Sequence, residues 1–288
     1  MKLQFLICLM VLLGSAKAKA QPGTHIRFSS SHAMFPDTAR AKGHLYQGQL
    51  YDAASHYNDS SVWVYVPAYY RPSAHPELIY WFHGWSNNLD TANQKYRVTE
   101  QFFASRRNAV WIMVEGPKNA PDSYGGKLEQ PAQFQALINE VLDTLATHHF
   151  LKKSTRHFSD CNITLGGHSG AYRVISRILN YTPVKEVLLF DALYGGNEAY
   201  LEWIKQPGHR FVNIFTHVGG TDQNSALVAK LLTDSLHVPV TNIKEEVLDQ
   251  VKHIGGATVF IDSQQTHSGV LTYEDRLKRL LQLFPLLK

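Results

Sequence analysis

The residue with the clearest chemical potential is Ser169, which lies in a glycine-rich turn within residues 161–180, CNITLGGHSGAYRVISRILN. An apolar run over residues 163–165 precedes the turn, and apolar residues at helical spacing follow it. A serine at a sharp strand-to-helix turn exposes its hydroxyl, an arrangement known as a nucleophile elbow. The usual pattern is G-x-S-x-G, and Ala171 takes the last position here. The stretch therefore predicts a serine that attacks acyl carbonyls, with an ordinary turn serine as the alternative.

A serine hydroxyl is a poor nucleophile without a neighbouring base, and His267 is the candidate for that base. It follows the last predicted strand, residues 258–261, and precedes the closing helix, residues 277–284. A loop at this point can bring the imidazole over the elbow. A surface histidine is the alternative interpretation, since the chain has 15 histidines.

Two aspartates compete for the acid that would orient this imidazole. Asp191 directly ends the apolar run of residues 187–190, where an unpaired carboxylate would be unfavourable. Asp222 follows the run of residues 211–215 after a short glycine turn, and N-capping of the next helix is its structural alternative. The residues alone leave both candidates open.

Two backbone N–H groups are expected to stabilise an oxyanion. Gly170 follows the nucleophile, and Trp85 lies in the loop after the apolar run of residues 78–82. His83, in the same loop, is expected to brace it rather than to transfer protons. In the later loop of residues 115–127, Tyr124 is a candidate substrate contact, and an ordinary surface turn is the equal alternative.

Strands that alternate with helices must position these residues, which predicts a mostly parallel sheet with helices on both faces. We expect one domain over residues 21–288. Residues 21–42 look irregular, and residues 44–51 and 62–66 look like an antiparallel pair at the sheet edge. The remaining strands are expected at residues 78–82, 110–114, 163–165, 187–190, 211–215 and 258–261, and helices at 89–103, 134–145, 172–179, 227–232 and 277–284.

Residues 1–20 have the pattern of a secretory signal peptide. Lys2 supplies the positive start, residues 3–13 form an apolar core, and Ala18-Lys19-Ala20 resembles a cleavage site. The apolar run is too short to serve as a membrane anchor. We therefore expect a secreted or periplasmic protein without a stable membrane anchor.

Charge and cysteine content narrow the function classes. Residues 1–20 hold three of the 28 basic residues and none of the 24 acidic ones, so the mature chain would be nearly neutral. That balance gives no support to a nucleic-acid partner. Cys161 would be the mature chain's single cysteine, which excludes an intrachain disulfide. We interpret it as a packed thiol without a function. The sequence contains no zinc-protease motif, metal-binding Cys/His spacing or Walker loop, so we expect neither a metal nor a cofactor.

Taken together, these pieces resemble an α/β-hydrolase, close to exported single-domain bacterial esterases. The resemblance rests on His83-Gly84 after a strand, the elbow at Ser169, a later acid and the final histidine, in the family order of Ser, Asp, His. It implies a serine hydrolase of carboxylic esters with a small-molecule acyl substrate. The alternatives are an amidase or peptidase of the same fold, or a non-catalytic binding protein on this scaffold.

The resemblance also bears on two open points. Family position favours Asp222 over Asp191 as the triad acid, because most members carry the acid after that later strand. Residues 192–211 leave room for one helix and no large cap domain. We therefore expect an open cleft that takes soluble or short-acyl substrates.

Overall fold

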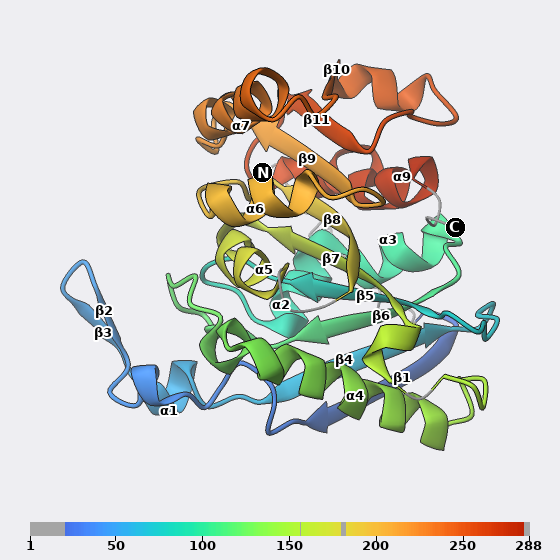
Figure 1. The fold of residues 1–288 in the computed structure, drawn as a ribbon. Coiled ribbons are helices and arrows are strands. Elements are labelled where there is room, and N and C mark those ends of the chain that lie inside the picture. The colour runs from blue at the N-terminus through green and yellow to red at the C-terminus, as the bar shows by residue number, and fades with distance from the viewer. Residues whose placement is uncertain (1–20, 156, 180–182, 285–288) are drawn as a thin grey trace, which may run out of the picture.

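A nine-stranded sheet forms the centre of the computed structural model, which describes residues 21–155, 157–179 and 183–284 (Figure 1). The predicted signal peptide lies outside the described residues, as do residues 285–288. In spatial order the strands are β1 (Gly23–Ser29), β4 (Ser61–Pro67), β6 (Ala109–Val114), β5 (Glu77–Phe82), β7 (Asn162–His168), β8 (Val184–Phe190), β9 (Arg210–Thr216), β11 (Thr258–Ser263) and β10 (Thr241–Lys244). β4 alone runs in the opposite direction to the other eight strands, so the prediction of a mostly parallel sheet is confirmed.

Helices cover both faces of this sheet, as predicted (Figure 1). One face packs against α4 (Pro131–Thr147), α5 (Tyr172–Ile178), α6 (Asn197–Ile204) and α7 (Asp222–Lys230). The other packs against α2 (Leu89–Tyr96), α3 (Val98–Ser105), α8 (Gly269–Thr272) and α9 (Arg276–Leu283). The central strands β5 and β6 are buried at every position, which explains why they appear in the sequence as unbroken apolar runs. Cys161 is a free, buried thiol.

The amino-terminal region differs from the expectation. The supposedly irregular segment contains β1, which pairs with β4 along seven residues. Residues 44–51 do not pair with β4; they fold back on themselves as the hairpin β2 (His44–Tyr46) and β3 (Gln49–Tyr51), which projects from the body beside the short helix α1 (Ala53–His56) (Figure 1). The tight turn between these short strands favours local pairing, and β1 takes the edge position.

Two further boundaries differ. The helix expected at residues 89–103 is two helices, separated by Arg97 in the left-handed backbone region. The short edge strand β10 was not expected, because its sequence, TNIK, is largely polar and alternates in exposure. Neither difference moves a predicted site residue from the sheet edge at which the parallel strands end.

Buried charged residues near the amino-terminal ends of the central strands pair with one another. Arg107 is buried and forms ion pairs with Glu77 at the start of β5 and Glu186 in β8, and Arg210 pairs with Glu186 at 3.2 Å. Thr164 donates a hydrogen bond to Glu77 at 3.0 Å. This cluster lies within the starting halves of β5, β7, β8 and β9. It therefore stabilises the strands at the end away from the candidate site.

Candidate active site

The predicted site residues meet at the carboxyl-terminal edge of the sheet. Ser169 follows β7, Asp191 follows β8, and the loop with His267 follows β11. The loop with Trp85 follows β5. Parallel strands end at one edge, so residues far apart in the sequence come together there.

The elbow has the backbone strain that the pattern predicts. β7 ends at His168, Ser169 has a φ of 57°, and a single 3-10 turn, Ser169–Ala171, leads into α5. A non-glycine residue in this region is uncommon and persists only where the surroundings fix it. A Cβ atom at Gly167 would lie 2.5 Å from the Ala171 Cβ, so glycine is required there and the alanine of the variant pattern is accommodated.

The loop after β5 packs directly on the elbow. A Cβ atom at Gly84 would lie 2.6 Å from the Ser169 Cβ and 2.8 Å from the His168 carbonyl oxygen. His83 lies behind this contact, with Nδ1 2.8 Å from the Gly84 carbonyl oxygen and Nε2 2.8 Å from a Glu115 oxygen. Both partners of the His83–Glu115 pair are buried, which agrees with the expected bracing role of His83.

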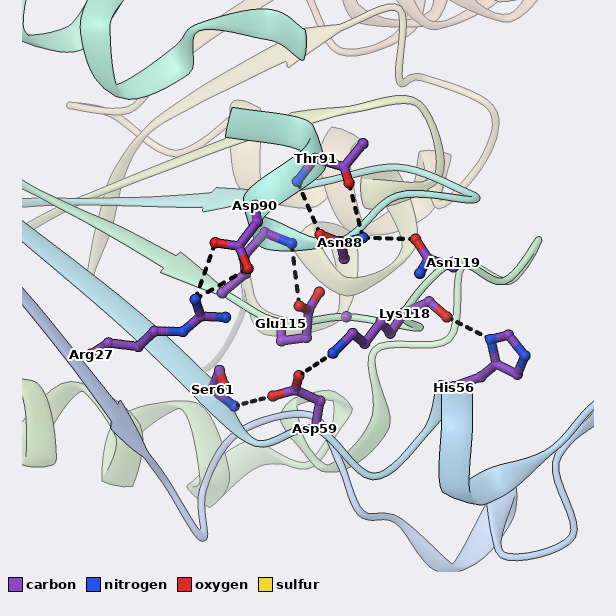
Figure 2. A network of polar contacts seen from close by, with 12 residues as sticks. Arg27, His56, Asp59, Ser61, Asn88, Asp90, Thr91, Glu115, Lys118 and Asn119 are labelled. Atoms are coloured by element: carbon purple, nitrogen blue, oxygen red, sulfur yellow. Dashed lines mark hydrogen bonds and ion pairs between the residues drawn. The ribbon is translucent and has the colours of Figure 1, made fainter. Parts of the chain in front are cut away.

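Glu115 connects this brace to a wider polar network (Figure 2). Its second carboxylate oxygen accepts a hydrogen bond from the backbone of Leu89, the first residue of α2, at 3.2 Å. Asn88, the N-cap of α2, reaches across to Asn119 at 2.8 Å (Figure 2). Lys118 pairs with Asp59 at 2.8 Å beside them. The loops after β5 and β6 are therefore held as one unit.

The side chain of Trp85 lies against Gly170, and the role of their backbone amides in an oxyanion hole stays a prediction. A Cβ atom at Gly170 would lie 2.5 Å from the Trp85 indole ring. The indole N–H donates a 2.6 Å hydrogen bond to the Ser123 hydroxyl, which fixes the ring as one wall of the site. The Gly170 N–H belongs to the first turn after β7, where amides have no partner within the helix.

The structure brings Asp191, not Asp222, into contact with His267. The His267 Nδ1–H donates to the Asp191 Oδ2 at 2.6 Å. Thr216 donates to the same carboxylate from its backbone at 3.1 Å and from its hydroxyl at 2.7 Å, and the Thr221 hydroxyl donates as well. Burial by itself raises the pKa of Asp191, but hydrogen bonds from His267, Thr221 and Thr216 outweigh it and hold that pKa below its usual value. Asp191 therefore carries a fully buried negative charge next to the imidazole.

Asp222 has a different partner, so the structure does not support the family-position preference for it. It is the first residue of α7, and its carboxylate lies 3.2 Å from Nδ1 of His217. The other ring nitrogen of His217 lies 2.8 Å from Asp262. The turn after β9 directs Thr221, the residue before Asp222, toward the site instead. Asp222 contributes an acidic charge at a helix N-terminus, a common structural role.

His168 is a contact between the elbow and the His267 loop that the sequence did not indicate. Its Nε2–H donates to the His267 carbonyl oxygen at 2.8 Å, and the two rings lie 4.5 Å apart. Burial, with smaller contributions from His267 and Lys95, lowers the pKa of His168 to about 3. The ring is therefore neutral, and it adds no second positive charge beside His267.

Ser169 and His267 line one cleft of about 610 Å³. Its walls are largely aromatic, with Trp85, Tyr96, Tyr172 and Tyr194 around the two polar residues. Between β8 and β9 the chain forms the single helix α6, so no cap domain covers the cleft, as predicted.

Tyr124 does not line this cleft, so its expected substrate contact is not supported. Its hydroxyl donates to Asp37 at 3.0 Å, and its ring packs under the guanidinium groups of Arg40 and Arg173. These contacts turn it away from the elbow. The neighbouring Ser123 is the residue of that loop that reaches the cleft.

Several site residues were missed because nothing in their local sequence distinguishes them. Thr216 and Thr221 become important only through the position of Asp191, and Glu115 only through His83. A polar residue at the end of an apolar strand, as Glu115 is after β6, is the single signal that could have been used. Across the described ranges, no group of three or more His, Cys, Asp or Glu side chains is placed to hold a metal ion. No helix in the same ranges is long and apolar enough to cross a membrane.

Gly84→Ala should displace the elbow, because its methyl group would enter the space of the Ser169 side chain. We expect a loss of about 1–3 kcal/mol in the free energy of unfolding, the usual result of overpacking, measured by urea denaturation. Gly255→Ala is the matched control, since a Cβ atom there meets nothing within 4 Å. Equal stability of the two variants would contradict the tight contact.

His168→Gln should reduce the sensitivity of the fold to acid while it keeps an N–H donor for the His267 carbonyl. A histidine in the unfolded chain has a pKa of about 6.5, against about 3 for folded His168. Between these values the unfolded chain binds the additional proton, so the wild type loses stability as the pH falls. Urea denaturation at stepwise lower pH should show a shallower loss for His168→Gln than for the exposed control His253→Gln. Identical slopes would contradict a neutral, buried His168.

No family model matches the sequence, and no curated protein matches it. Solved structures do match. The feruloyl esterase module of Clostridium thermocellum has a TM-score of 0.53 at 14% identity, over 92% of this chain and 90% of that one. Carboxyl esterase 2 of Tuber melanosporum has a TM-score of 0.52 at 12% identity, over 93% and 86%. The fluorophosphonate-binding serine hydrolase F of Staphylococcus aureus has a TM-score of 0.50 at 13% identity, over 90% and 97%. From the sheet order, the elbow and these likenesses, we conclude that the chain has the α/β-hydrolase fold.

Proposed function

We propose that the protein is a serine hydrolase of carboxylic esters, with Ser169 as nucleophile, His267 as base and Asp191 as the acid that orients it. The observation that carries the proposal is the 2.6 Å contact between Asp191 and His267, together with the cleft that His267 shares with Ser169. The two esterases named above support an ester as the bond cleaved, because they have the same fold.

The reaction begins when the Ser169 Oγ attacks the carbonyl carbon of the ester and His267 Nε2 accepts the hydroxyl proton. Asp191 stabilises the imidazolium through its hydrogen bond to Nδ1. The backbone N–H groups of Gly170 and Trp85 bind the oxyanion, and one such donor contributes about 3 kcal/mol in the transition state. The C–O bond of the ester then breaks, and His267 returns the proton to the departing alcohol.

Water completes the cycle. It attacks the acyl group on Ser169, gives a proton to His267, and the acid leaves as the proton returns to the Ser169 oxygen. No metal or cofactor takes part in these steps. Asp191 remains ionised throughout, which its lowered pKa favours.

The place of action is proposed to lie outside the cytoplasm, in the periplasm or the medium. The signal-peptide pattern of residues 1–20 supports this proposal. A small-molecule ester is the proposed partner, and the proposal involves neither nucleic acid nor a membrane anchor.

Labelling with a fluorophosphonate probe tests the proposal directly. The folded wild-type protein should be labelled at neutral pH on the peptide that contains Ser169, and Ser169→Ala should not react. A folded wild type that resists the probe would overturn the proposal and favour a non-catalytic binding protein.

The two aspartates should behave differently when each is changed to asparagine. Asp191→Asn should lower kcat on the order of 10⁴-fold, because the imidazole loses its orientation and its stabilising charge. Asp222→Asn should keep a near wild-type kcat and lose up to about 1 kcal/mol of stability at the start of α7. Steady-state assays and melting temperatures measure both effects. The reverse pattern of rates would show that the acid is Asp222 despite the contact with Asp191.

The uncapped cleft should favour short acyl groups. Turnover of p-nitrophenyl acetate or butyrate should exceed that of the palmitate ester, since a single helix, α6, occupies the region in which a lid would lie. Rates measured across the acyl series, with and without a lipid–water interface, provide the test. A sharp rise in activity at the interface would contradict an open cleft.

A further inference from the structure

The cleft contains one formal charge that the proposed reaction does not use. Of the residues that line it, Lys95 is the single lysine or arginine, and none is an aspartate or glutamate. The other lining groups are aromatic rings, hydroxyls, an amide and the two histidines already described. Asp191 lies beneath the surface of the cleft, with its charge directed to His267. The lining of the cleft therefore carries one positive formal charge and no negative one.

Lys95 itself is exposed and has no carboxylate partner within the described ranges. It lies in the last turn of α2, with its ammonium group 5.0 Å from the centre of the Tyr96 ring. Some other lysines pair with acidic neighbours, as Lys118 does with Asp59 and Lys230 with Asp234. Its charge is close enough to the elbow to contribute, after burial and His267, to the lowered pKa of His168.

A second hollow on the surface has a different balance of charge. It has a volume of about 700 Å³ and lies between α5 and α6. Arg173 and Arg177 line it together with Glu198 and Glu202, so both signs of charge are present. That hollow offers no preference for an anion, whereas the cleft does.

We propose that the cleft binds esters whose non-reacting part carries a carboxylate, and that Lys95 is the residue that pairs with it. This inference rests on the proposed function, because it names the substrate class of the same site. Half-esters of dicarboxylic acids have this chemistry. The aromatic walls would contact the carbon chain between the two carboxyl groups, while Lys95 selects the charged end.

The structural alternative for Lys95 is a role in α2 alone. A lysine in the last turn of a helix interacts favourably with the helix dipole. Such a role predicts a change in stability and no change in the choice of substrate. The two roles are therefore separable by measurement.

The first experiment compares two esters of similar length, mono-p-nitrophenyl glutarate and p-nitrophenyl valerate. In Lys95→Met the ratio of their kcat/KM values, glutarate to valerate, should fall roughly five-fold. The fall should come from a higher KM for the glutarate ester. Lys95→Arg should restore most of the ratio. Lys252→Met, which removes an exposed lysine before β11, is the matched control and should leave the ratio at the wild-type value. In the wild type the ratio should also fall as the ionic strength rises from about 0.01 M to about 1 M.

Three results would overturn the inference while the proposed function stands. One is an unchanged ratio in Lys95→Met, with a lower melting temperature, which is the helix-dipole outcome. Another is an equal fall in Lys252→Met, which would indicate net charge rather than a site. The third is a ratio that does not respond to salt.

A binding measurement separates failure of the inference from failure of the proposed function. In the Ser169→Ala background, calorimetry with the glutarate half-ester should show about five-fold weaker binding when Lys95→Met is added. If the wild type hydrolyses neither ester but this difference in binding is present, the carboxylate site stands and the proposed hydrolysis fails. If the difference in binding is absent, the inference fails whatever the rates show.

Discussion

The hydrogen bond between Asp191 and His267 is the interaction on which the rest of the site depends. It joins the end of β8 to the loop after β11, across the intervening strand β9. A fully buried carboxylate is unfavourable unless hydrogen bonds and a partner surround it. The turn after β9 supplies those hydrogen bonds through Thr216 and Thr221. A side chain at Gly219 would collide with Asp191, since its Cβ would lie 1.7 Å from the carboxylate oxygen. The sequence of the β9 turn is thus explained by the carboxylate that it encloses.

A second constraint holds the nucleophile against this pair. Gly84 packs against the strained backbone at Ser169, and the neutral ring of the preceding His168 is hydrogen-bonded to the His267 carbonyl. Behind Gly84, the buried pair of His83 and Glu115 fixes the loop whose amide is proposed to bind the oxyanion. Strain of this kind persists only where neighbouring elements over-determine the conformation. Here the loops after β5 and β6 provide that support, and the helices leave the cleft side uncovered.

The sequence predicted those features that local patterns encode. Buried strands appear as apolar runs and the elbow as a turn of small residues, so the parallel sheet and the positions of Ser169 and His267 at its edge could be foreseen. The acid could not be decided, because the choice between Asp191 and Asp222 depends on where the β9 turn directs its side chains. Tyr124 and Ser123 are adjacent in the sequence, yet only Ser123 reaches the cleft, since Tyr124 packs with Arg40. The predicted pairing of residues 44–51 with residues 62–66 was wrong, because an alternating pattern does not determine which strand is the partner.

The most direct measurement of the central claim is proton NMR of the hydrogen on His267 Nδ1. A strong hydrogen bond to a buried carboxylate shifts this proton far downfield of the backbone amides. The structure predicts such a resonance in the wild type, its loss in Asp191→Asn and in His267→Gln, and its persistence in Asp222→Asn. A resonance that survives in Asp191→Asn and disappears in Asp222→Asn would contradict the account.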